Sequence, residues 1–288
     1  MLKISTEIKS TSRFVGERKA IELIAEAGFD AWDFSMFSMI NYDWKTRVAT
    51  LTDHPIAGPD AYKFARELRD IGESNGIVCN QSHAPHPTYC KAIADCYEKC
   101  IELTAEAGGK ICIIHPDNYK PAEENAEIFN RLLPVAKGCG VKIATENMWN
   151  WCEETKSAAP AACSDPKSFL DHLNAVNDEY LVACLDIGHS EMLGLDTSAP
   201  EMIDALGAHL QALHIHDNDK KGDRHAIPFS MSIDFDAVAK ALKRINYSGY
   251  LTLEAVNHLY NYGPGNLIVG VKELADSAKK LAMMIENA

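Results

Sequence analysis

A dense run of histidine and aspartate residues lies in the last third of this 288-residue chain. It reads His214-Ile215-His216-Asp217-Asn218-Asp219, and Asp223-Arg224-His225 follows closely. Side chains two positions apart share one face of an extended strand, so His214 and His216 are expected to point the same way. Histidine is the commonest metal ligand in proteins, and the run therefore indicates a metal site. A solvated turn after a buried strand is the competing interpretation.

Three other apolar stretches change abruptly to a carboxylate, at Glu146, Asp186 and Glu254. If these stretches end at one point, their carboxylates would repel strongly in a dry cavity, and a divalent cation would remove that repulsion. A mixed oxygen and nitrogen set of this kind suits Mn²⁺, Mg²⁺, Co²⁺ or Zn²⁺. The predicted ligands of the main metal are Glu146, Asp186, His214 and Glu254. The set contains no cysteine, which disfavours a closed structural zinc site.

A metal with open positions can hold two oxygens of a polyol or hydroxy-ketone, polarise the carbonyl and acidify the neighbouring hydroxyl. Glu146 and Glu254 could then act as an acid/base pair that moves a proton at carbon. Pure ligation is the alternative role of both glutamates, and the residues alone leave the two roles open.

Short apolar stretches alternate with segments of helical periodicity along the whole chain. Strands are predicted at 2–6, 29–35, 77–83, 110–115, 141–146, 181–186, 212–219 and 250–254. Helices are predicted at 16–27, 60–75, 87–107, 122–137, from 165 onward, and at 200–206, 235–245 and 267–286, with 36–59 and 149–164 as long irregular loops.

This alternation predicts the α/β class and a single (β/α)₈ TIM barrel that occupies residues 1–288 as one domain. A doubly wound open sheet is the runner-up, but the Gly-x-Gly-x-x-Gly turn expected after its first strand is absent. Active sites of such barrels lie at the carboxyl ends of the strands. The residues predicted at those ends are His83, His115, Glu146, Asp186, His189, His214, His216 and Glu254.

Composition narrows the possible partners and the cellular setting. The net charge of −13 disfavours nucleic acid as a partner. The nine cysteines form no Cys-x-x-Cys pair, which predicts reduced thiols in a cytoplasmic protein. There is no signal pattern at the start of the sequence and no apolar run of about eighteen residues, so we expect no membrane span. These features do not decide whether the chain forms a homo-oligomer.

Two tryptophans next to the predicted strand ends, Trp32 and Trp149, could form the walls of a sugar pocket, because aromatic faces pack on sugar C–H surfaces. Packing in the core is the alternative for Trp32.

Taken together, the motifs resemble the xylose isomerase-like TIM barrel superfamily, which is the sugar phosphate isomerase/epimerase group and its relative endonuclease IV. The resemblance covers nearly the whole chain. It rests on Ser82-His83-Ala84-Pro85, Ile114-His115-Pro116, Thr145-Glu146-Asn147, Leu185-Asp186-Ile187-Gly188-His189, Leu213-His214-Ile215-His216-Asp217-Asn218-Asp219, Asp223-Arg224-His225 and Leu253-Glu254.

The resemblance implies a metal-dependent isomerase or epimerase of a small sugar, polyol or keto-sugar. Glu146, Asp186, His214 and Glu254 match the metal ligands common to the group, and the two glutamates match the acid/base pair of its ketose 3-epimerases. His189 and Arg224 match positions that touch substrate there. His216 is assigned to substrate or to the surroundings of the ligands, and an exchange of roles with His214 is left open.

Endonuclease IV provides the alternative, a multi-zinc phosphodiesterase acting on abasic DNA. The additional ligand positions of its three-zinc cluster are also filled here, by His83, His115, His189, Asp223 and His225, so more than one ion could bind. Against it stand the net charge of −13, Asp117-Asn118 after His115-Pro116, and the missing Gly-x-Gly after His225. The missing glycines depart from many sugar isomerases too, and therefore keep a third alternative open, a barrel that binds a sugar without turning it over.

Overall fold

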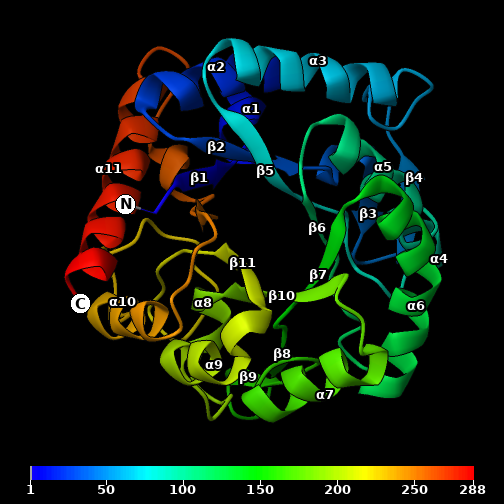
Figure 1. Cartoon of the computed structure of the whole chain (residues 1–288), viewed down its shortest axis with the longest axis vertical. Helices are drawn as coiled ribbons and strands as arrows, with labels where there is room; N and C mark the ends of the chain where they lie inside the picture. The colour runs from blue at the N-terminus through cyan, green and yellow to red at the C-terminus, as the bar shows by residue number, and fades with distance from the viewer. Residues whose placement is uncertain (1) are drawn as a thin grey trace.

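The computed structural model describes residues 2–288 and has the strands closed into a barrel inside a ring of helices (Figure 1). The strands of the barrel are β1 (Ile4–Glu7), β2 (Ala31–Ser35), β5 (Val78–His83), β6 (Ile111–Ile113), β7 (Lys142–Glu146), β10 (Leu181–Asp186), β11 (Leu210–His214) and β12 (Leu251–Leu253). They pair in parallel in the order β11-β10-β7-β6-β5-β2-β1-β12, and a parallel bridge between Ile215 and Leu253 joins the two ends. The predicted (β/α)₈ barrel is confirmed.

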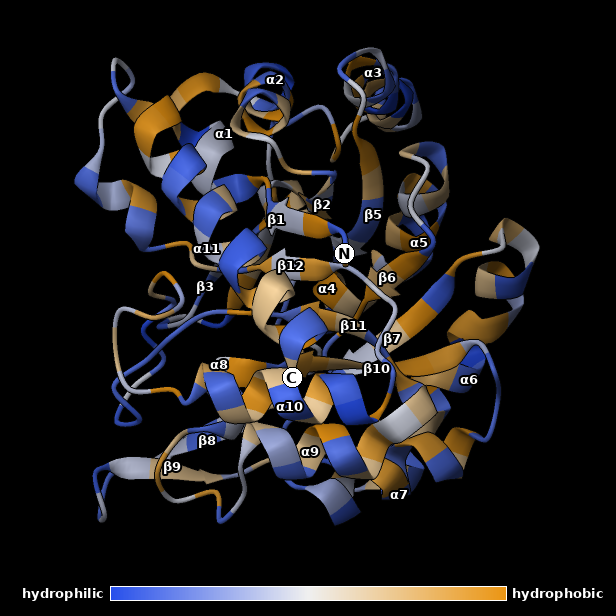
Figure 2. Cartoon of the chain, turned by 60° about the vertical axis from the view of Figure 1, so that its left-hand side comes forward, coloured by the Kyte–Doolittle hydropathy of each residue, from blue (hydrophilic) through white to orange (hydrophobic). Residues whose placement is uncertain are grey.

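The α-helices pack with their apolar sides against this sheet, as the striped colouring of the helices in Figure 2 illustrates. They are α1 (Lys9–Val15), α2 (Glu17–Ala27), α3 (Ala61–Ser74), α4 (Lys91–Ala94), α5 (Tyr97–Glu106), α6 (Ala122–Cys139), α7 (Pro166–Val176), α8 (Ile187–Ser190), α9 (Ala199–Leu206), α10 (Phe235–Arg244) and α11 (Leu267–Asn287). Short 3₁₀ turns lie at η1 (Phe37–Met39), η2 (Gly207–His209) and η3 (His258–Asn261). None of the helices in residues 2–288 combines the length and the apolar character needed to cross a membrane.

The two segments predicted as irregular loops are instead built around β-hairpins. β3 (Ile40–Asp43) pairs with β4 (Val48–Leu51), and β8 (Trp149–Cys152) pairs with β9 (Ser157–Pro160). Each of these strands has only four residues, and much of each hairpin is exposed, so no regular apolar alternation marks them in the sequence. Both hairpins stand next to strand ends and therefore shape the rim of the barrel mouth.

Helix α1 was not predicted, and the segment 87–107 is two helices, α4 and α5, rather than one. The sequence of α1 begins Lys-Ser-Thr-Ser-Arg and has no apolar stripe, so periodicity does not reveal it. Its place directly after β1 puts its polar side chains at the barrel mouth.

The inside of the barrel is divided into an apolar side and a polar side. The apolar side is formed by Ile113, Ala144, Val182, Cys184 and Ala212. On the polar side, the Asn80 amide donates to Thr252 Oγ1 (3.1 Å), and Gln81 Nε2 donates to Asp33 Oδ2 (2.9 Å). The polar side is thus a connected hydrogen-bond network, and Asp33 is its member nearest to the chemistry described below.

The alternation of β2 sends Asp33 into the barrel and its neighbours Trp32 and Phe34 outward. Trp32 is fully buried, packs edge-to-face on Phe34 (5.5 Å between ring centroids), and comes so near α3 that a Cβ on Gly72 would lie 2.9 Å from its Nε1. This corrects the prediction that Trp32 is part of a sugar pocket wall: it is a core residue on the helix side of the sheet.

Replacement of Trp32 by alanine should therefore act on stability. We expect Trp32→Ala to lower the free energy of unfolding by about 3–5 kcal/mol, because it removes a large buried side chain and leaves a cavity. Trp44→Ala is a matched control, since Trp44 is 61% exposed, and it should change stability by less than about 0.5 kcal/mol. Urea unfolding followed by circular dichroism measures both, and equal small losses would contradict the core assignment.

Candidate functional site

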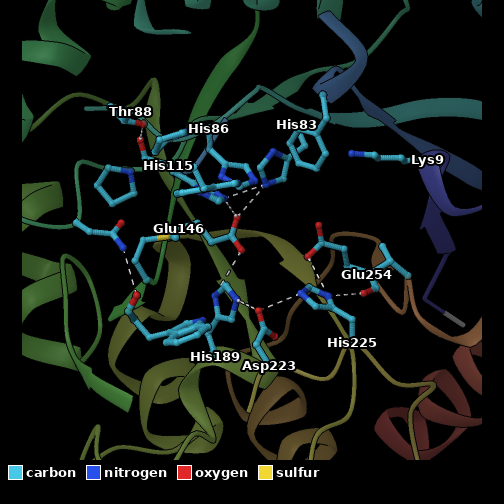
Figure 3. Close-up of a pocket in the computed structure, with 18 of the residues that line it drawn as sticks. Lys9, His83, His86, Thr88, His115, Glu146, His189, Asp223, His225 and Glu254 are labelled. Carbon is cyan, nitrogen blue, oxygen red and sulfur yellow. Dashed lines mark hydrogen bonds and ion pairs between the residues drawn. The ribbon is translucent and has the colours of Figure 1, made fainter. Parts of the chain in front are cut away.

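A pocket of about 440 Å³ opens at the carboxyl ends of the barrel strands. Its floor carries His83, His115, Glu146, His189, Asp223, His225 and Glu254, and Figure 3 shows these side chains turned toward one another. Residues outside the predicted set form part of the walls, among them Lys9, Trp44, His86, Tyr119 and Tyr260. The strand-end rule therefore places the pocket correctly.

The four predicted ligands of the main metal come together at one point. The donor atoms of Glu146, Asp186, His214 and Glu254 all lie within 4.8 Å of one another, a geometry that could hold a metal ion. His214 Nδ1 is 3.2 Å from Glu146 Oε1 and 3.7 Å from Glu254 Oε2. Glu146, Asp186 and His214 are almost completely shielded from solvent.

His214 is oriented from behind by Asp33, a residue that sequence reasoning missed. His214 Nε2 lies 3.3 Å from Asp33 Oδ2, and the same oxygen accepts the hydrogen bond from Gln81. When Asp33 accepts a hydrogen bond from Nε2–H, the neutral ring has its lone pair on Nδ1, on the side of Glu146. Supporting carboxylates orient metal-bound imidazoles in this way. The available signal was the charged residue between Trp32 and Phe34 in an otherwise apolar strand.

Asp186 is fixed by the start of α8 and by Asn147. Its Oδ1 accepts from the His189 backbone N–H (2.8 Å). The Asn147 side chain accepts from the Asp186 N–H (2.7 Å) and donates to the Asp186 carbonyl (2.9 Å). Asp186 Oδ2 is buried and, in the described part of the chain, has no hydrogen-bond partner.

A second group that could hold a metal consists of His83, His115 and Glu146. The Nε2 atoms of the two histidines face each other at 3.0 Å, and His115 Nε2 is 3.2 Å from Glu146 Oε2. Glu146 Oε2 is buried and lacks a hydrogen bond within residues 2–288. Glu146 is thus shared, with Oε1 toward the first group and Oε2 toward the second.

The third group consists of His189, His216, Asp223 and His225. Asp223 Oδ2 lies 3.3 Å from His189 Nε2 and 3.1 Å from His225 Nε2. His216 Nε2 is 3.1 Å from Asp186 Oδ1, yet this pair does not have hydrogen-bond geometry. His216 Nε2 and Asp223 Oδ1 are both buried and unbonded among the described residues, as expected of atoms that serve as ligands.

Three of the histidines have their tautomer fixed by the backbone. His83 Nδ1 donates to the Ala84 carbonyl (2.8 Å), His189 Nδ1 to the Asn147 carbonyl (2.9 Å), and His225 Nδ1 to the Glu254 carbonyl (2.7 Å). A carbonyl only accepts, so each Nδ1 carries a proton and each Nε2 is the ring nitrogen that faces the pocket, where it would bind a cation after losing its own proton. This is the second-layer hydrogen bonding typical of metal-ligating histidines.

Neighbouring histidines stabilise the ionised forms of Glu146 and Asp186. Burial opposes the charge on Glu146, but His214 and His115 hold its pKa well below the usual range. Burial likewise opposes the charge on Asp186, and His189 and His216 lower its pKa to about 2. Buried anions with unbonded oxygens, next to imidazoles that turn a ring nitrogen inward, are a donor set that fits divalent cations, because a cation can take the place of the protons that these rings carry.

The predicted substrate contacts are only partly found at the pocket. His189 and Trp149 line it. His216 is fully buried and does not line the pocket, because its Nε2 turns toward Asp186 and Asp223. Arg224 lies on the outer surface, where its Nη2 is 2.9 Å from Asp219 Oδ2. The assignments of His216 and Arg224 to substrate are therefore corrected.

Comparison with known proteins places the chain in a family. A curated relative, an uncharacterised protein of Methanocaldococcus jannaschii, is 25% identical over 83% of this chain and 78% of its own. The ketose 3-epimerase of Arthrobacter globiformis is 23% identical, again over 83% of this chain and 78% of its own. The crystal structure of an IolI protein with a bound zinc atom superposes with a TM-score of 0.70 at 17% identity, over 99% of both chains. The sequence model of the xylose isomerase-like TIM barrel family matches residues 21–283. The chain belongs to the xylose isomerase-like TIM barrel family.

Proposed function

We propose that this protein is a divalent-metal-dependent isomerase or epimerase of a small sugar, polyol or keto-sugar. The observation that carries the proposal is the convergence of Glu146, Asp186, His214 and Glu254 from four strand ends within 4.8 Å. The name of the ketose 3-epimerase relative and the zinc atom in the IolI structure support the same chemistry.

The metal would be held by these four residues. When bound, a divalent cation would polarise the substrate carbonyl and acidify the adjacent hydroxyl. Trp149 and His189 line the same pocket and would orient a sugar there.

Proton transfer would fall to the two glutamates. Figure 3 shows Glu146 and Glu254 reaching the pocket from different sides, from the ends of β7 and β12. One carboxylate would take the proton as the substrate C–H bond breaks, and the electron pair would move into the neighbouring carbonyl. The other glutamate would enter the reaction as the carboxylic acid and deliver its proton to the opposite face of the same carbon as the carbonyl re-forms, which inverts the configuration of that carbon.

The proposal predicts metal-dependent exchange of a substrate C–H proton with solvent. With Mn²⁺ present, a ketohexose should incorporate deuterium from D₂O, observed by proton NMR. Glu254→Gln should abolish this exchange, because an amide cannot accept the proton but keeps an oxygen for the metal.

Elemental analysis of Glu254→Gln is the necessary control, since loss of metal would also stop exchange. Exchange at the wild-type rate in a metal-loaded variant would rule out Glu254 as a base. A wild-type protein that binds ketoses tightly without any exchange would favour the non-catalytic sugar-binding barrel.

Asp33 should affect metal affinity without touching the metal. We expect Asp33→Asn to weaken binding by about 10–100-fold, because an amide supports the required His214 tautomer less well than a carboxylate. A titration against a fluorescent chelator measures the change. The exposed Asp53→Asn makes the same substitution away from the pocket and should leave affinity unchanged; an equal effect of both changes would remove Asp33 from this role.

A specific observation favours a second candidate, a multi-metal phosphodiesterase similar to endonuclease IV. Three groups that could hold a metal lie side by side, and Glu146 belongs to two of them. If the group of His83 and His115 also held a cation, Glu146 Oε2 would be engaged as its ligand and could not carry a proton.

Metal stoichiometry and DNA cleavage separate the two candidates. The isomerase predicts one tightly bound ion per chain and no cleavage of a duplex that contains an abasic site. Three zinc ions per chain, with cleavage that weakens as salt is raised, would favour the phosphodiesterase instead.

A further inference from the structure

Two basic side chains of helix α1 stand on one wall of the pocket. Lys9 and Arg13 are four positions apart, so they lie on the same side of the helix, one turn from each other. Both line the pocket together with Glu254, Val256 and Tyr260. Figure 3 shows the Lys9 ammonium directed into the pocket, on the side where Glu254 lies.

Among the described residues, neither cation forms a close ion pair, although Glu7 and Glu254 act on the charge of Lys9 from a greater distance. Within residues 2–288, no carboxylate oxygen lies within 4.0 Å of the Lys9 ammonium or the Arg13 guanidinium. Other basic residues in this part of the chain also lack an ion pair, but Lys9 and Arg13 are the ones that line the pocket. Arg18, on the next helix, has an acidic partner outside the pocket, with two hydrogen bonds to Glu67 at 2.6 and 2.8 Å.

Aromatic rings hold the two cations in place instead. Lys9 Nζ lies 4.6 Å from the centroid of the Phe37 ring, and Arg13 Cζ lies 3.6 Å from that of Tyr260. Arg13 also donates from Nη2 to the Val256 carbonyl (2.8 Å). Cation–π contact uses the charge without occupying the N–H donors, so donors of both groups remain available to a ligand.

The carboxylates on the pocket floor have histidines as their nearest basic neighbours. Glu146 and Asp223 are engaged by histidines, and Glu254 Oε2 lies 3.7 Å from both His214 Nδ1 and His225 Nδ1. In the proposed function Glu146 and Glu254 would be directed at the metal. The N–H donors of Lys9 and Arg13 would then be left for the substrate.

We infer that Lys9 and Arg13 form an anion subsite that binds a carboxylate or phosphate group of the substrate. The inference rests on the proposed function and narrows its substrate class to anionic keto-sugars, meaning sugar acids or sugar phosphates. An ammonium beside a guanidinium matches the oxygens of either anion through charge-assisted hydrogen bonds. The anionic end would lie against α1, and the keto end would reach Glu146 and Glu254.

Three ligands with one carbon skeleton test the subsite: D-fructose, D-fructuronate and D-fructose 6-phosphate. Binding to the Mn²⁺-loaded full chain is measured by calorimetry, so the test does not require turnover. At least one anion should bind about tenfold or more tighter than fructose. Which anion gains the advantage distinguishes a carboxylate site from a phosphate site.

The Lys9→Ala/Arg13→Ala double variant should lose this advantage, so that the anions bind to it no more tightly than fructose does. Arg18→Ala/Lys19→Ala removes the same charge from a neighbouring helix outside the pocket and should retain the advantage. The single variants Lys9→Gln and Arg13→Gln should each lose part of the anion advantage. They replace the double variant in the test if that variant does not fold.

Two results would overturn the subsite. The first is that the wild-type protein binds all three ligands equally or binds none of them. The second is that the folded double variant still binds an anion more tightly than fructose, which would mean that the anion binds to the metal. Deuterium exchange of neutral ketoses reports separately on the proposed function. That exchange can therefore succeed while the subsite fails, or fail while the subsite succeeds.

Discussion

The structure depends on the need to neutralise ionised carboxylates that the barrel brings together out of water. Glu146 and Asp186 are buried at adjoining strand ends and keep low pKa values only because histidines surround them. Buried anions of this kind are costly unless each is paired and hydrogen-bonded. Several of the polar atoms at the site nevertheless lack a hydrogen bond among the described residues. This unfavourable free energy arises where the ends of the parallel strands point into a common cavity. A divalent cation bound there would reduce it.

The rest of the barrel mouth limits how those side chains can move. The backbone carbonyls after the strands fix the tautomers of His83, His189 and His225, and Asn147 clamps the main chain of Asp186. Below them, the polar half of the barrel interior orients His214 through Asp33. Donors held in this way do not need to reorganise when a cation enters, which is the structural condition for a preorganised site. The apolar half of the interior supplies packing, and the two halves together explain why a barrel filled only with aliphatic residues could not support this site.

The sequence predicts the barrel and the floor of the pocket because both follow from strong local signals. Strands of five or six mostly apolar residues end in Glu146, Asp186 and His214, and a closed parallel barrel leaves only one place where such ends can meet. The incorrect and missing predictions also have local causes. Trp32 shares its strand with Asp33, and only the register of the closed sheet decides which of the two faces inward. Arg224 follows Asp223 immediately, but the turn that directs Asp223 to the pocket sends Arg224 to solvent and to Asp219. Helix α1 has no periodic signal, so Lys9 and Arg13 could not be placed on the pocket wall before the structure was known.

The position of Glu146 links the chemistry of the site to the number of cations it would hold. Its two oxygens face two different groups of ligands, His214 on one side and His115 on the other. With a single ion at the first group, the second oxygen is free to carry a proton, and the pair with Glu254 is complete. With neighbouring groups filled, the same oxygen becomes a ligand, and the site is suited to activating water rather than to moving a proton at carbon. One set of side chains in one barrel can therefore support either reaction. The substrate would then be selected by the walls of the pocket, where α1 places two cations that form no ion pair within residues 2–288.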